Sequence, residues 1–191
     1  MSTHDDLRDI ALNEFAVAGY AGTSLQRIAE IAGLSKSSVL YHFDSKEALL
    51  EAAIGPAIDK MGAILDSVEG TALVADTRRI FIEQFVDFLL ANRLEVHMFI
   101  NQGPGLEDVP VIDRANALVI KLGTFFSTSV NTVEDQLRFG IALGGAAYVL
   151  SVKQDESQSE SLGSQPIDEV RAALITIVSE LLAPVSVRNI Q

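Results

Sequence analysis

The side chains best suited to chemistry lie between residues 23 and 47, and they are hydrogen-bond donors rather than nucleophiles or metal ligands. Lys36 is a cation, Ser37 carries a short hydroxyl, and Tyr41 and His42 carry polar tips on flat rings. Such groups bind phosphate oxygens or the edges of nucleic-acid bases. These types are compatible with a binding surface and supply no evident nucleophile.

The common patterns of catalytic and metal sites are absent from the sequence. There is no cysteine, which excludes thiol chemistry, and His4, His42 and His97 are too scattered to read as a metal cluster. No glycine-rich phosphate loop and no Gly-x-Ser-x-Gly turn occurs. The acid pairs Glu107-Asp108 and Glu134-Asp135 are better explained as charges at helix starts, where they interact favourably with the helix dipole. We expect no enzyme activity, no metal and no cofactor.

Two short helices joined by a tight turn are expected to position the donors. Thr23 can cap the first helix, with Gln26 three residues on as its capping-box partner. Ile28, Ala29, Ile31 and Ala32 place apolar groups on one side of that helix. Gly33 falls at its end, where glycine tolerates the left-handed conformation.

The second helix is predicted over residues 35–43. Ser35 is its expected cap, and Val39 and Phe43, four residues apart, share its buried face. Asp44 or Ser45 can cap the next helix. Two helices joined by a turn that contains glycine form a helix-turn-helix, whose second helix lies in the major groove of DNA.

This pattern resembles the N-terminal DNA-binding domain of TetR-type (tetracycline-repressor-like) transcriptional regulators. The agreement is carried by Ile10–Phe15, Gly19-Tyr20, Thr23-Ser24, Ile28-Ala29, Ala32–Ser35, Tyr41–Phe43, Ser45–Glu47 and Leu49-Leu50. It covers roughly residues 7 to 50, about a quarter of the chain, and many positions agree at fixed spacing. The remaining sequence matches no motif.

The resemblance implies a set of DNA contacts. These are Thr23, Ser24, Gln26, Arg27, Ser35, Lys36, Ser37, Ser38, Leu40, Tyr41, His42 and Lys46. Leu40 departs from the pattern, because many relatives carry tyrosine there. Its apolar side chain either touches a thymine methyl or packs against the next helix, and the sequence leaves both alternatives open.

The chain is predicted to be all-α with about nine helices. Residues 1–50 form the helix-turn-helix DNA-binding domain, and residues 51–191 form a ligand-binding and dimerisation domain. Beyond residue 43, helices are expected over 45–68, 76–93, 94–102, 110–130, 132–152 and 167–183. Gly55-Pro56 falls inside the first of these, as either a moving hinge or a static kink.

Charge and hydropathy limit which partners the protein can have. The net charge is −12, and residues 1–50 hold four cations against seven acids, or −3. Bulk charge therefore does not drive nucleic-acid binding, and a discrete basic face is expected. Residues 1–6 lack a secretory pattern, and the apolar run from Ile141 to Leu150 is far shorter than the ~20 residues that span a bilayer. We expect a cytoplasmic protein with no membrane partner.

The family resemblance implies a homodimer and a small-molecule effector. The candidate ligand-binding residues are Met61, Gln84, Phe85, Phe88, His97, Asn101, Phe125 and Phe126. The candidate dimer-interface residues are Gly140, Gly144, Ala147, Val170, Leu174, Ile177 and Leu181, although the last two helices can instead close the core of one subunit. The predicted function is a dimeric repressor released from operator DNA by a small apolar or amphipathic effector. The alternative is an effector-independent helix-turn-helix adaptor that binds DNA or protein.

Overall fold

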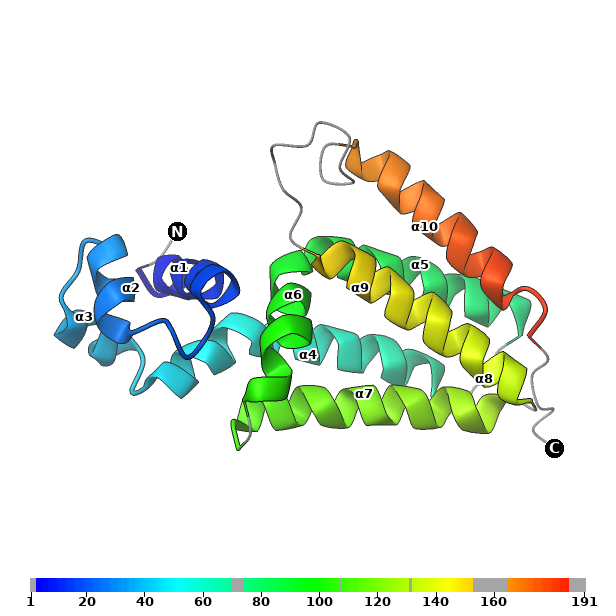
Figure 1. Cartoon of the computed structure of the whole chain (residues 1–191), viewed down its shortest axis with the longest axis horizontal. Coiled ribbons are helices and arrows are strands. Elements are labelled where there is room, and N and C mark those ends of the chain that lie inside the picture. The colour runs from blue at the N-terminus through cyan, green and yellow to red at the C-terminus, as the bar shows by residue number, and fades with distance from the viewer. Residues whose placement is uncertain (1–2, 70–73, 107, 131, 153–164, 186–191) are drawn as a thin grey trace. The chain divides into compact units, whose positions relative to one another are not determined.

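The computed structural model describes residues 3–69, 74–106, 108–130, 132–152 and 165–185, and in these ranges the fold is all-α, as predicted (Figure 1). In chain order the helices are α1 (Thr3–Ala18), α2 (Leu25–Ile31), α3 (Lys36–His42), α4 (Lys46–Val68), α5 (Ala75–Ala91), α6 (Arg93–Gln102), α7 (Pro110–Ser129), α8 (Val133–Phe139), α9 (Gly145–Ser151) and α10 (Ile167–Leu182). A 3₁₀ turn, η1 (Gly103–Gly105), follows α6, and a π-helix, η2 (Gly140–Gly144), joins α8 to α9.

The chain divides into two compact units. Unit 1 comprises Met1–Asp59 and Leu94–Asn116, and unit 2 comprises Lys60–Arg93 and Ala117–Gln191. The division falls inside α4 and inside α7, and α4 itself continues as a helix through Pro56. The predicted domain boundary at residue 50 stays a functional prediction, because unit 1 takes in segments from both sides of it.

Unit 1 is built around a single apolar core. Its fully buried members come from α1, α2, α3, the start of α4, α6 and the start of α7. They include Leu7, Ala11, Phe15, Ile28, Ala29, Val39, Leu49, Leu50 and Met98. On α1 the buried side chains are Leu7, Ala11, Leu12, Phe15 and Ala16.

Local capping explains where α2 and α3 begin. The cap of α2 is Ser24, whose Oγ accepts a hydrogen bond from the N–H of Arg27 at 3.1 Å. The predicted capping box of Thr23 and Gln26 is therefore wrong: Gln26 donates instead to Glu30. Gly33 adopts φ +68° as predicted, which ends α2 in the left-handed conformation.

Thr23 has a different task from the one predicted for it. It is buried, and its hydroxyl donates to the backbone carbonyls of Gly19 at 2.9 Å and Glu14 at 3.2 Å. Thr23→Val keeps the shape of the side chain but leaves both carbonyls without this donor. We expect a loss of about 1–3 kcal/mol in the free energy of unfolding. Chemical denaturation followed by circular dichroism measures it, and an unchanged midpoint would contradict the structural role.

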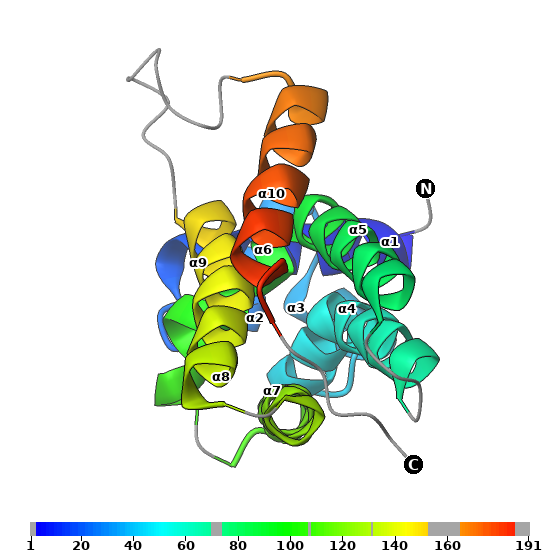
Figure 2. The ribbon, with the colours of Figure 1, turned by 90° about the vertical axis from the view of Figure 1, so that its right-hand side faces the viewer.

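Unit 2 packs its helices around aromatic side chains. Phe81 of α5 lies 5.4 Å from Phe126 of α7, and Phe126 stacks on Phe139 of α8 at 4.1 Å between ring centroids. Helix α10 contacts α5, α8 and η2 (Figure 2). Arg171 of α10 pairs with Asp87 of α5, with Nη2 to Oδ2 at 2.9 Å, and this pair lowers the pKa of Asp87.

The predicted helix over residues 132–152 is present, but it is not regular. Thr132 caps it, accepting from the N–H of Asp135 at 3.0 Å. Between α8 and α9 the hydrogen bonding changes to the wider π form over η2, which contains Gly140 and Gly144. Such π segments are rare and are found mainly as single turns inside α-helices.

No helix in the described ranges combines the length and apolar character that crossing a membrane needs.

Candidate nucleic-acid interface

Helix α3 has one buried side and one open side. Val39 is fully buried and Phe43, at its C-cap, is 5% exposed, as the sequence predicted. On the other side Tyr41 is 86% exposed, and Lys36 and Ser37 are also exposed. Because successive residues turn by about 100° around a helix, Ser37 and Tyr41 project directly away from the buried pair. Unit 1 therefore holds α3 from beneath and leaves its polar side open.

The serines at the start of α3 form a small hydroxyl cluster. Ser35 caps the helix as predicted, and its Oγ accepts from the N–H of Ser38 at 3.1 Å. The same Oγ lies 2.8 Å from Oγ of Ser38 and 3.4 Å from Oγ of Ser37. These bonds fix the direction of the Ser35 side chain, while the exposed hydroxyl of Ser37 keeps capacity for an outside acceptor.

The four cations of residues 3–59, all of which the structure describes, differ in their surroundings. Arg8 is paired with Asp5 and Asp9, and Arg27 lies 3.4 Å from the carboxylate of Glu14. Lys46 contacts Tyr20 within unit 1. Lys36 alone has no ion pair or hydrogen bond within the described chain. The free positive charge on this face is thus concentrated at the first residue of α3.

Lys46 lies against the turn that follows α1. Its ammonium donates to the backbone carbonyl of Tyr20 and lies 4.1 Å from the centroid of that ring. Partial burial lowers the pKa of Lys46. The Tyr20 hydroxyl donates to Glu47 at 3.0 Å, and burial followed by this bond raises the pKa of Tyr20. The three side chains fasten the start of α4 to the α1–α2 turn, a contact that sequence spacing did not reveal.

The N-terminal turn of α1 also packs against the end of α3. The ring of His4 lies 4.4 Å from that of Phe43 and 6.4 Å from that of His42. His42 is half-buried, and its ring lies edge-on to Tyr41 at 5.4 Å. His4 was not singled out from the sequence, because nothing in the local pattern connects residues nearly forty positions apart.

The other predicted DNA-contact residues have mixed placements. Ser24, Gln26 and Arg27 are exposed on α2 or its cap, Ser38 is half-buried, and Leu40 is 39% exposed. Thr23 is 3% exposed and its hydroxyl points to backbone carbonyls inside unit 1. This placement argues against Thr23 as a phosphate contact. The structure thus gathers Lys36, Ser37, Leu40 and Tyr41 on one open face.

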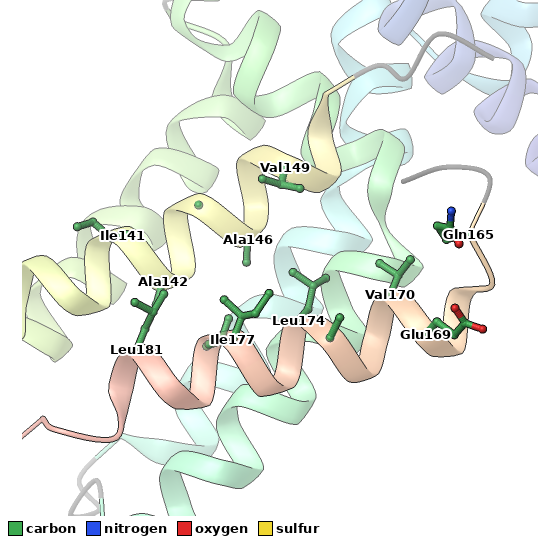
Figure 3. A pocket seen from close by; sticks show the side chains of 13 residues that line it. Ile141, Ala142, Ala146, Val149, Gln165, Glu169, Val170, Leu174, Ile177 and Leu181 are labelled. Carbon is green, nitrogen blue, oxygen red and sulfur yellow. The ribbon is translucent and has the colours of Figure 1, made fainter. Parts of the chain in front are cut away.

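A second feature, in unit 2, is an apolar groove beside α10. It is lined by Ile141, Ala142, Gly145, Ala146, Val149, Gln165, Glu169, Val170, Ala173, Leu174, Ile177, Val178 and Leu181, and it encloses about 510 Å³. Figure 3 shows Val170, Leu174 and Ile177 of α10 facing Ala146 and Val149 of α9, with Gln165 and Glu169 at one end. Ile141 and Ile177 are more than half exposed, which is unusual for large apolar side chains gathered on one face.

The groove overlaps the predicted dimer interface only in part. Val170, Leu174, Ile177 and Leu181 all line it. Gly140 and Gly144 are exposed and Ala147 is half-buried, and none of the three lines the groove. A Cβ atom added at Gly140 or Gly144 would meet nothing within 4 Å in the described chain, so the fold of one chain does not require glycine at either position.

The eight predicted ligand-binding residues are spread over both units. His97 and Asn101 belong to unit 1, where the Asn101 amide donates to the His97 carbonyl at 2.9 Å. The other six belong to unit 2. There Met61, Phe85 and Phe126 are buried, Phe88 and Phe125 are half-buried, and Gln84 is exposed. None of the eight lines the groove beside α10.

Known proteins resemble this chain most clearly in the segment that contains α3. Residues 7–53 match the family model described as bacterial regulatory proteins of the tetR family. The HTH-type transcriptional regulator RutR of Escherichia coli K12 is 33% identical over 119 residues, which cover 57% of this chain and 56% of RutR. The negative regulator IcaR of Staphylococcus aureus is 36% identical over 61 residues, or 32% of this chain and 33% of IcaR. The chain thus aligns with about half or less of these relatives.

Solved structures share the fold over nearly the whole chain, beyond the N-terminal domain. The TetR-family regulator SCO3833 of Streptomyces coelicolor is 25% identical, with a TM-score of 0.68 over 90% of this chain and 88% of that one. The ketosteroid transcriptional regulator KstR2 of Mycobacterium tuberculosis has a TM-score of 0.74 at 16% identity, covering 97% and 95%. Residues 7–53 thus form an N-terminal domain of the tetR type, and the described chain has the fold of solved TetR-family regulators.

Proposed function

We propose that this protein is a dimeric repressor that binds operator DNA through α3 and is released by a small apolar or amphipathic effector. The open face of α3 carries the proposal: Ser37 and Tyr41 project away from the buried Val39 and Phe43, and Lys36 is exposed at the first residue of the helix. A helix anchored in this way is supported from behind while its outer side chains reach base edges and phosphates. IcaR, described as a negative transcriptional regulator, supports repression as the direction of control.

The dimer is supported by the apolar groove and by the exposed side chains around it. Ile141, Tyr148, Ile167 and Ile177 are each more than half exposed on α10 and the helix that precedes it. Burying such a surface against a second copy is favourable, and a two-fold dimer places two α3 helices on two half-sites of the same operator. The open space around Gly140 and Gly144 leaves room for a second backbone to approach.

Release by an effector is supported by the family relation alone. If an effector lowers the affinity for the operator, the operator must lower the affinity for the effector by the same factor. The aromatic contacts of unit 2 favour the alternative, an effector-independent adaptor, because Phe81, Phe126 and Phe139 pack on one another. A screen of apolar and amphipathic compounds for displacement of bound operator separates the two.

The test of DNA binding is fluorescence anisotropy with the DNA that flanks the reading frame. With Lys36, Arg27 and Lys46 as the possible phosphate contacts of each subunit, a dimer neutralises at most about six phosphates. The slope of log affinity against log salt concentration should then be no steeper than about −5. Random DNA of equal length is the control. The proposal fails if the flanking DNA binds no better than random DNA at every salt concentration.

A further inference from the structure

Leu40 is an apolar side chain on the open side of α3. It is 39% exposed, whereas its neighbour Val39 is fully buried and Phe43 is 5% exposed. The contact between α3 and the core of unit 1 is thus made by Val39 and Phe43. The first of the two alternatives left by the sequence, a leucine that touches something outside the chain, agrees with this exposure. The second, a leucine that packs against the next helix, accounts only for the covered part of the side chain.

The neighbours of Leu40 define what it faces. With about 100° of rotation per residue, Leu40 lies between the buried side of α3 and the outermost residue, Tyr41. Lys36 lies one turn earlier on the same side. A leucine in this position is surrounded by groups suited to DNA, namely the free cation of Lys36 and the exposed hydroxyl-bearing ring of Tyr41.

The major groove offers such a leucine one apolar partner. The other features there are hydrogen-bond donors and acceptors, and covering one of them with a leucine removes its water without replacing the hydrogen bond. The 5-methyl group of thymine is the exception. We propose that Leu40 contacts the 5-methyl group of a thymine and so specifies one A·T pair in each operator half-site. The inference rests on the proposed binding of operator DNA.

The geometry of α3 also sets where this thymine lies. Four residues of helix rise separate Lys36 from Leu40 by about 6 Å, and successive base pairs are about 3.4 Å apart. The thymine should therefore lie one or two base pairs from the base or phosphate that Lys36 contacts. This spacing makes the assignment specific to position rather than to overall A·T content.

Selection from random double-stranded DNA is the first test. Bound sequences are recovered with the full-length protein, with Leu40→Ala and with Leu94→Ala. Leu94 is the matched control, since it is a leucine of α6 in unit 1 that is 41% exposed. We expect the unaltered protein and Leu94→Ala to select the same half-site. Leu40→Ala should lose the preference for thymine at one position and keep the others.

Replacing thymine by deoxyuridine in the selected sequence is the second test, and it leaves the protein unchanged. Each replacement removes only the 5-methyl group. At one thymine position of the half-site, a single replacement should weaken binding of the unaltered protein by about fourfold, as expected for one buried methyl group. The same replacement should not affect Leu40→Ala.

Two outcomes overturn different claims. If the unaltered protein enriches no sequence, the proposed operator binding itself is wrong. If it enriches a half-site but Leu40→Ala selects the same bases and no deoxyuridine replacement weakens binding, the assignment of Leu40 is wrong while DNA binding stands. Circular dichroism of Leu40→Ala shows whether that variant is folded, and the deoxyuridine series decides the matter if it is not.

Discussion

Ile177→Asp should convert the protein to a monomer and lower its affinity for a two-half-site operator by at least a hundredfold. Ile177 lies on α10, lines the groove and is 52% exposed in the single chain. An aspartate there stays hydrated in the monomer, but a second copy would bury its charge without a partner. A monomer engages one half-site at a time and loses the gain from linked binding, which is 10²–10⁴-fold in favourable cases. Light scattering after size exclusion and fluorescence anisotropy measure the two effects.

Two further variants of the same helices separate the interface from general damage. Thr176→Asp adds the same charge one position earlier on α10, at an exposed residue that does not line the groove, and should remain dimeric. Gly144→Leu adds bulk where one chain has open space, so it should weaken the dimer without disturbing the monomer. A dimeric Ile177→Asp with unchanged operator affinity would place the interface elsewhere on the molecule.

Lys36→Glu should have the largest effect of any single change in unit 1 on DNA binding. Lys36 is the cation of residues 3–59 that makes no ion pair or hydrogen bond within the described chain. Its reversal replaces attraction by repulsion at a base edge or phosphate, once in each half-site. A good base contact is worth about 1–3 kcal/mol. Two lost contacts should therefore reduce operator affinity by at least about thirtyfold.

Lys60→Glu is the matched control for this charge reversal. Lys60 is exposed on the part of α4 that belongs to unit 2, where its ammonium donates to Asn92 at 3.5 Å, and the variant changes the net charge by the same amount. Exposed charges farther away than the screening length of about 8 Å contribute little at physiological salt, so the control should lose no more than about twofold. Equal losses in Lys36→Glu and Lys60→Glu would show that bulk charge, rather than α3, governs binding.

The sequence predicted the parts of the DNA-binding unit that depend on neighbours along the chain. Ser35 caps α3, Val39 and Phe43 are buried, and Gly33 takes a positive φ, because caps, helical faces and turns are set within a few residues. Thr23 was misassigned as a cap because its real partners, the carbonyls of Glu14 and Gly19, come from the end of α1 and the turn after it. Ile31, expected on the buried side of α2, is 42% exposed.

The body was predicted less completely than the helix-turn-helix. Of the seven predicted dimer-interface residues, the four on α10 line the groove. The three predicted on the preceding helix, Gly140, Gly144 and Ala147, do not line it. Their neighbours, including Ile141 and Val149, line the groove instead. The π-helix lies between α8 and α9 and changes the register of that helix, and no simple sequence signal predicts such a segment.

The most direct test of the central claim is a photochemical cross-link between α3 and a base. Thymines of the selected DNA are replaced one at a time by 5-bromodeoxyuridine, the complex is irradiated, and the attached peptide is identified by mass spectrometry. If α3 lies in the major groove, the cross-linked peptide contains Tyr41, whose ring is 86% exposed on that face. A cross-link found only in peptides of unit 2, or in α1, would contradict the assignment of α3 as the helix that reads DNA.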